Sequence, residues 1–148
     1  LSNKERENKY SSKGIKTMKK ILSAFLLLCL AACDGSFTMS DLVGKWQLQT
    51  MDAQPMSADA MVSLDIQADG KFSGKAPVNR YFGQINVENG MLKTSPVGST
   101  MMAASPELMD AEQAYFKVLN DAETAKIVDG KLVITGKQGG KLVFNKTE

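Results

Sequence analysis

Apolar and polar residues alternate in eight short segments that begin near residue 45. In the first, residues 45–51, Trp46 and Leu48 fall on one face and Gln47 and Gln49 on the other. This period of two is typical of a β-strand that buries one face. The same reading predicts seven further strands at residues 62–67, 71–75, 81–88, 91–95, 124–128, 131–135 and 141–145.

Four dipeptides separate neighbouring strands, and all of them contain glycine. They are Asp69-Gly70, Asn89-Gly90, Asp129-Gly130 and Gly139-Gly140. Such pairs supply the positive φ angles that two-residue hairpin turns require. Because consecutive strands joined by hairpins are antiparallel, the pattern predicts an antiparallel meander.

One segment has the spacing of a helix instead. Ser105-Pro106-Glu107 combines an N-cap residue, a proline suited to the first helical position and an acid suited to the first turn. Apolar residues then recur at helical intervals as far as Asn120, namely Leu108, Ala111, Tyr115 and Leu119. We therefore expect an α+β fold, an antiparallel β meander or half-barrel of about eight strands with one packed α-helix.

Upstream of the strands lies a continuous apolar run, residues 21–33, preceded by Lys19 and Lys20. Positive charge, an apolar run and small residues in that order are typical of a secretory signal peptide. The run is too short to span a membrane as a helix, which takes roughly 20 apolar residues.

The end of this run, Leu30-Ala31-Ala32-Cys33, resembles the lipobox of bacterial lipoprotein precursors. The resemblance implies cleavage before Cys33 and acylation of that cysteine, with membrane lipid as the partner and a domain facing the periplasm. Several acyl chains would anchor the protein stably, whereas one alone is marginal. The alternative is an apolar core segment that happens to contain a cysteine.

Asp34 directly follows the candidate lipidation site. By resemblance, an aspartate there is the sorting signal that keeps a lipoprotein of enteric-type bacteria in the inner membrane. We therefore favour the inner membrane, with the outer membrane as the alternative in other lineages. The other interpretation is that Asp34 is merely a solvated residue of the tether and has no role in sorting.

These features divide the chain into four parts. Residues 1–17 are expected to be an extension upstream of the true start at Met18, with a long basic signal region as the alternative. Residues 18–32 are the predicted signal peptide, 33–41 a membrane tether and 42–148 the folded domain.

Processing would change the charge of the protein. The 148-residue chain has 18 Lys and Arg against 16 Asp and Glu, a net charge of +2. Removing residues 1–32 takes away seven of these bases and two of these acids, which leaves 11 against 14, a net charge of −3. The basicity therefore belongs to the removed part, and we expect no nucleic-acid partner.

The residue inventory also restricts chemistry. The chain contains no histidine and only two cysteines, Cys29 in the signal and Cys33. Ser-His-Asp catalysis and histidine-bound zinc are thereby excluded. We expect no enzymatic activity, no cofactor and no metal site, and a monomer.

The ordered motifs of the domain resemble the META domain family, which includes HslJ-like bacterial lipoproteins. The likeness spans about residues 42–146 and rests on Trp46-x-Leu48, Gly70-Lys71-Phe72-Ser73-Gly74, Asn79-Arg80-Tyr81-Phe82-Gly83, Ser99-Thr100-Met101-Met102 and Lys131-Leu132-Val133-Ile134. It implies a non-enzymatic envelope protein with a binding role, associated with stress or drug tolerance. Two positions where the family often has cysteines hold Val78 and Ala103 here.

Seven residues are candidates for partner binding: Asn79, Arg80, Tyr81, Met101, Met102, Tyr115 and Phe116. Asn79 could shape a turn that presents Arg80 and Tyr81 to a partner, or it could simply pin a loop onto residues 99–104. The methionines could bind Cu(I) or form an adaptable peptide groove. The alternative is that they fill irregular space in the hydrophobic core, a role that needs no ligand.

Two other function classes compete with a general binding role. One is an assembly chaperone, because the META fold resembles secretin pilotins, which hold an apolar peptide of a secretin or other envelope protein. It requires a crevice between helix and sheet lined by Met101, Met102, Tyr115 or Phe116, and a filled core would argue against it. The other is a hydrolase, which requires two carboxylates roughly 5–9 Å apart.

Overall fold

The computed structural model describes residues 37–56 and 60–148. The chain divides into two units, Leu1–Asp34 and Gly35–Glu148, and all of the described residues belong to the second. The predicted signal peptide, Cys33 and Asp34 lie outside the described residues.

The described part contains one long helix, one helical turn and ten strands. They are α1 (Met39–Leu42), β1 (Gly44–Met51), β2 (Gln54–Pro55), β3 (Ser63–Ile66), β4 (Lys71–Lys75), β5 (Arg80–Glu88), β6 (Met91–Thr94), β7 (Gly98–Ser99), α2 (Pro106–Asn120), β8 (Ala122–Val128), β9 (Lys131–Gly136) and β10 (Lys141–Thr147).

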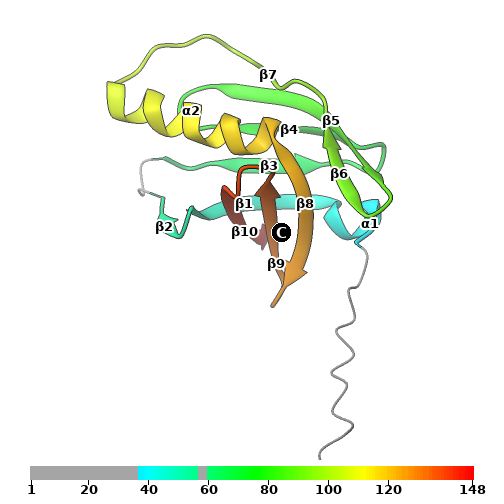
Figure 1. The fold of residues 1–148 in the computed structure, drawn as a ribbon. Coiled ribbons are helices and arrows are strands. Elements are labelled where there is room, and N and C mark those ends of the chain that lie inside the picture. Colours follow the sequence, from blue (N-terminus) through cyan, green and yellow to red (C-terminus); the bar gives the residue numbers. More distant parts are fainter. Residues whose placement is uncertain (1–36, 57–59) are drawn as a thin grey trace, which may run out of the picture. The chain divides into compact units, whose positions relative to one another are not determined.

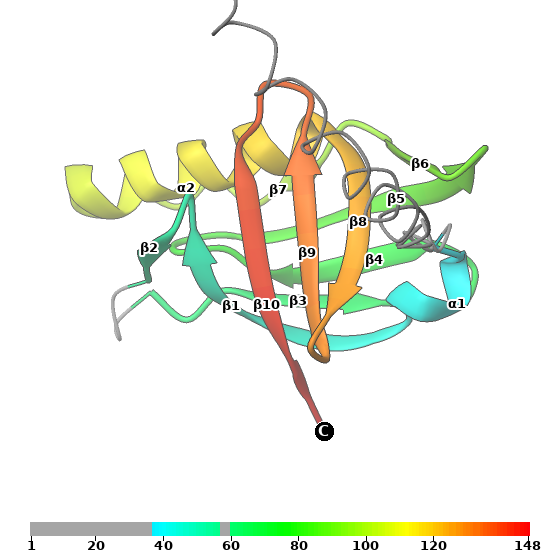
Figure 2. The same cartoon turned by 60° about the horizontal axis from the view of Figure 1, so that its bottom comes forward.

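The strands form one antiparallel sheet that curls into a nearly closed barrel (Figures 1 and 2). The order is β6-β5-β4-β3-β1-β10-β9-β8, with β2 beside β1 and β7 beside β5. β6 and β8, at the two ends of this order, contact each other, although no strand pairing joins them among the described residues. Helix α2 packs against β9 and β10. The predicted α+β fold is confirmed.

The eight predicted strands and the predicted helix are all present, and the structure adds two strands of two residues, β2 and β7. The predicted tether, residues 33–41, lies only in part within the described residues. Phe37 and Met39 pack against the hydrophobic core, and α1 begins at Met39. These apolar side chains therefore belong to the folded unit.

Two of the four predicted hairpin turns have the expected backbone. Asn89-Gly90 and Asp129-Gly130 both have two residues with positive φ. At Asp69-Gly70 and Gly139-Gly140 only one glycine does, so the prediction was wrong there. In the first of these, the Gly70 N–H donates to the Gln67 carbonyl at 3.0 Å and closes the turn, so that only the glycine that follows the turn needs left-handed backbone. The Asp69 carboxylate also accepts a hydrogen bond from the Lys71 backbone N–H at 3.0 Å.

The core fills the inside of the barrel and the space under α2. The largest fully buried side chains include Tyr81, Tyr115, Phe144, Leu64 and Leu132. Trp46, the single tryptophan, is 2% exposed, and its indole N–H donates to the Leu42 carbonyl at 2.9 Å. This bond attaches α1 to the first strand.

Candidate functional site

The most polar place inside the fold is a buried carboxylate on α2. Glu112 is 4% exposed, and one of its oxygens accepts from the backbone N–H groups of Val78 at 2.9 Å and Asn79 at 2.7 Å. Its other oxygen accepts from the Asn79 side-chain amide at 2.6 Å. No ion pair involves Glu112 among the described residues. Three N–H donors therefore replace the water that a carboxylate would otherwise require.

Asn79 extends this arrangement to the loop before the helix. Its side-chain oxygen accepts from the Thr100 hydroxyl at 2.8 Å and from the Met102 backbone N–H at 2.7 Å. Its amide also donates to the Met102 carbonyl at 3.3 Å. Of the two roles considered for Asn79, pinning the loop onto residues 99–104 is confirmed.

Two buried tyrosines lie beside this network. The Tyr81 hydroxyl donates to the Ser63 carbonyl at 2.7 Å, and it is 2.5 Å from the Tyr115 hydroxyl. The Tyr81 ring also meets the rings of Tyr115 and Phe116 edge to face, with centroids 5.5 and 5.6 Å apart. Burial raises the pKa of both tyrosines well above the usual value of about 10.

We expect the protein to lose stability in alkaline solution because of these two groups. Their protons are held in the folded state and released in the unfolded state, so their contribution is complete below about pH 10 and declines as pH rises further. Above about pH 10, each tyrosine should lower the free energy of unfolding by about 1.4 kcal/mol per pH unit. Tyr115→Phe removes one of the two groups, so it should make this decline less steep by about 1.4 kcal/mol per pH unit. Urea unfolding followed by Trp46 fluorescence between about pH 9 and 12 measures the slope.

The chain has a third tyrosine, Tyr10, which the variant Tyr10→Phe removes as a source of tyrosinate signal. In that variant, absorbance at about 295 nm should rise only with unfolding. A rise near pH 10 in folded protein would contradict the assignment of both hydroxyls to the interior.

The structure separates the seven predicted site residues into two groups. Asn79, Tyr81 and Tyr115 are buried and Phe116 is partly buried, whereas Arg80, Met101 and Met102 are exposed. Adjacent residues of a strand point to opposite faces, so Arg80 and Tyr81 at the start of β5 cannot both face one partner. The predicted crevice is not formed by these residues, because Tyr115 and Phe116 pack against Tyr81.

Glu112 was not among the predicted residues, although a signal for it exists. It lies at helical spacing from Leu108 and Phe116, on the stripe of α2 that also buries Tyr115 and Leu119. A charged residue on a buried stripe indicates internal partners. Here the partners are two backbone N–H groups and one amide, all from the residues just before β5.

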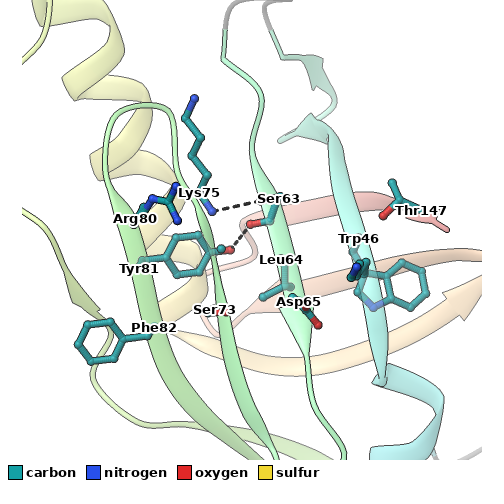
Figure 3. A pocket seen from close by; sticks show the side chains of 12 residues that line it. Trp46, Ser63, Leu64, Asp65, Ser73, Lys75, Arg80, Tyr81, Phe82 and Thr147 are labelled. Atoms are coloured by element: carbon teal, nitrogen blue, oxygen red, sulfur yellow. Dashed lines mark hydrogen bonds between the residues drawn. The ribbon is translucent and has the colours of Figure 1, made fainter.

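Arg80 lines a groove on the outer face of β1, β3, β4 and β5 (Figure 3). The groove has a volume of about 590 Å³. Its side chains include Lys45, Ser63, Asp65, Ser73, Lys75, Arg80 and Phe82. A concavity of this size suits a small organic ligand.

A second, more apolar pocket lies between α2 and the β1–β2 region. Its volume is about 250 Å³, and its lining includes Met51, Met56, Ala60, Leu108 and Ala111. A pocket between helix and sheet thus exists, but with other residues than those predicted.

Within residues 37–56 and 60–148, no group of three or more Cys, Asp or Glu residues is arranged to hold a metal ion. None of the described helices is both long and apolar enough to cross a bilayer.

Comparison with known proteins identifies a family and a fold. The sequence model of the META domain matches residues 40–148. No curated protein matches the chain. A solved protein from Burkholderia xenovorans has a TM-score of 0.59 at 22% identity, covering 74% of this chain and 86% of that one.

Two other solved structures have the same fold. One is an NMR structure with a TM-score of 0.61 at 20% identity, covering 74% of this chain and 95% of its own. The other, a DUF4847 family protein from Bacteroides vulgatus, has a TM-score of 0.51 at 14% identity and covers 71% of this chain and 94% of its own. At such identities the likeness concerns the fold alone.

Proposed function

This chain belongs to the META domain family, and we propose that it is a membrane-anchored envelope lipoprotein with a non-enzymatic binding role in stress or drug tolerance. The observation that carries the proposal is the position of the lipobox. Cys33 lies two residues before the compact unit Gly35–Glu148, and the family match starts at residue 40. Cleavage before Cys33 would therefore leave the folded domain intact and place an acylated residue next to it.

The binding role is supported by the arrangement of polar groups. The buried Glu112, Asn79 and Tyr115 are all engaged in bonds that hold the fold together. One accessible concave surface is the outer groove, which presents cations and an exposed phenylalanine. Such a surface suits recognition of a ligand.

Cys33→Ser should abolish incorporation of labelled palmitate and leave the precursor uncleaved. The chain offers a matched control, because Cys29 is a cysteine four residues earlier in the same apolar run. Cys29→Ser should be labelled and processed like the unaltered protein. Palmitate in the Cys33→Ser protein, or its loss from the Cys29→Ser protein, would refute the anchor. Density-gradient separation of membranes then tests the preference for the inner membrane that Asp34 suggests.

A second candidate function is an assembly chaperone that holds an apolar peptide of a secretin or another envelope protein. It is favoured by the apolar pocket beside α2, where Met51 and Met56 offer adaptable side chains. The pocket would accept one or two apolar side chains of a peptide rather than a whole helix.

Filling this pocket should prevent capture of such a partner. Ala111 lines the pocket, whereas Ala114, three residues later on the same helix, does not. After crosslinking in native membranes and mass spectrometry, Ala111→Phe should lose a partner that Ala114→Phe retains. If Ala111→Phe and Ala114→Phe recover the partner equally well, the pocket is not its binding site.

A further inference from the structure

The register of the sheet arranges the side chains of the outer groove in two rows. One row runs across the strands through Ser63, Lys75 and Arg80. The next runs through Lys45, Asp65, Ser73 and Phe82. Figure 3 shows Lys75 and Arg80 on one side of the groove and Phe82 further along the same strand as Arg80. The first row therefore brings two cations together.

Lys75 and Arg80 are directly opposite each other on β4 and β5. Like charges in this position destabilise a sheet. No carboxylate forms an ion pair with either side chain in the described part of the chain, although Asp65 lies in the same groove. This concentration of positive charge occurs in a domain that carries 11 bases against 14 acids after residue 32. An anion bound between the two cations would relieve their repulsion.

Ser63 adds a hydrogen-bond donor to this pair. Its hydroxyl oxygen accepts from the Lys75 backbone N–H at 3.1 Å. Within residues 37–56 and 60–148, the hydroxyl proton has no acceptor, and neither the Lys75 ammonium nor the Arg80 guanidinium forms a hydrogen bond. One ammonium, one guanidinium and one hydroxyl, all from residues that line the groove, are thus each free to donate to a ligand. Two charges and several donors match the dianion and the multiple acceptors of a phosphate better than a single carboxylate.

Phe82 supplies an apolar surface beside the cations. It lies two residues after Arg80 on the same face of β5, and its side chain is 64% exposed. Its ring rests over Gly98 of the paired strand, where a Cβ atom would lie 2.7 Å from the ring. Because Gly98 has no side chain, the Phe82 ring can pack directly against it, and the rest of the ring surface stays exposed to solvent. A ring held in this way can pack against an apolar or planar group of a ligand.

We propose that Lys75, Arg80 and Ser63 bind the phosphate group of an organic phosphate whose apolar or planar part packs on Phe82. This rests on the proposed binding role of the domain and names the chemistry of its ligand. The phosphate could belong to a lipid headgroup that ends in a phosphomonoester or to a soluble phosphate monoester, since both present the same dianionic group.

The test is calorimetric titration of the full chain, in a neutral detergent, with phenyl phosphate and with inorganic phosphate. Arg80→Gln and Lys75→Gln should each weaken binding of both probes about tenfold, the effect of one charged hydrogen bond. Phe82→Ala should weaken phenyl phosphate alone. Lys126→Gln, which removes an exposed lysine of β8 outside the groove, should change neither.

Competition against phenyl phosphate distinguishes the two sources. Displacement by dihexanoyl phosphatidic acid, a lipid phosphomonoester, assigns a lipid headgroup, and displacement by glycerol phosphate alone assigns a soluble ester. Benzoate binding as tightly as phenyl phosphate, equal weakening by Lys126→Gln, or no binding of either phosphate would overturn the proposal. Those failures would leave palmitate labelling of Cys33 unaffected, and a failed labelling experiment would leave this titration unaffected.

Discussion

Glu112→Ala is expected to lower the free energy of unfolding by about 3–5 kcal/mol, because it leaves buried donors without an acceptor. The carboxylate is the acceptor for the N–H groups of Val78 and Asn79 and for the Asn79 amide. Each buried donor left unpaired costs about 1–3 kcal/mol. Urea unfolding followed by the fluorescence of Trp46 measures the loss. Gln113→Ala, at the exposed neighbouring position, should change stability by about 0.5 kcal/mol or less.

An exchange of polarity between Asn79 and Glu112 tests whether their contact is the cause. In Asn79→Asp alone, two carboxylates would face each other, and in Glu112→Gln alone, two amides would. The double variant restores a donor opposite an acceptor and loses only the longest of the Asn79 bonds, the 3.3 Å bond to the Met102 carbonyl. It should be more stable than the sum of the single variants predicts, by about 1–3 kcal/mol. Strict additivity would mean that the Asn79–Glu112 contact contributes nothing.

The elements of this fold were predictable where the signal is local. The turns at Asn89-Gly90 and Asp129-Gly130 need left-handed backbone at adjacent positions, and those dipeptides are the ones that adopt it readily. The helix α2 was predictable because Pro106 begins it and an apolar stripe follows. Interactions between distant residues were not predictable in this way. The pairing of Trp46 with Lys146 across β1 and β10 depends on the curvature of the whole sheet.

The candidate site was predictable only in part for the same reason. Asn79 could be predicted to pin a loop because its own neighbours favour a turn. Its contact with Glu112 joins residues 33 positions apart, so only the folded chain reveals it. The facing cations Lys75 and Arg80 required the register of β4 and β5, which a local pattern does not specify.

Gly74→Ala is expected to destabilise the protein by about 3 kcal/mol or more, at the upper end of the cost of overpacking. Gly74 lies on β4 opposite Tyr81, next to the Ser63 carbonyl of β3 that accepts the tyrosine hydroxyl. A Cβ atom at this position would overlap the Ser63 carbonyl oxygen and lie 2.7 Å from the Tyr81 hydroxyl oxygen. Because the carbonyl belongs to the backbone of a paired strand, it cannot move without separating β3 from β4. Thermal and urea unfolding both report the loss.

Two further variants separate this overlap from other effects of replacing glycine. Gly90 has a φ of +73° with open space around it, so Gly90→Ala should cost only about 1–2 kcal/mol of backbone strain. Gly74→Ala combined with Tyr81→Phe removes the hydroxyl but keeps the carbonyl, and should therefore recover little stability. Full recovery in that double variant would mean that the hydroxyl alone limits the size of residue 74. If Gly74→Ala lowers the free energy of unfolding less than Gly90→Ala does, β3 and β4 have room for a methyl group at residue 74. The absence of a side chain at residue 74 would then not be what allows Tyr81 to pack so closely.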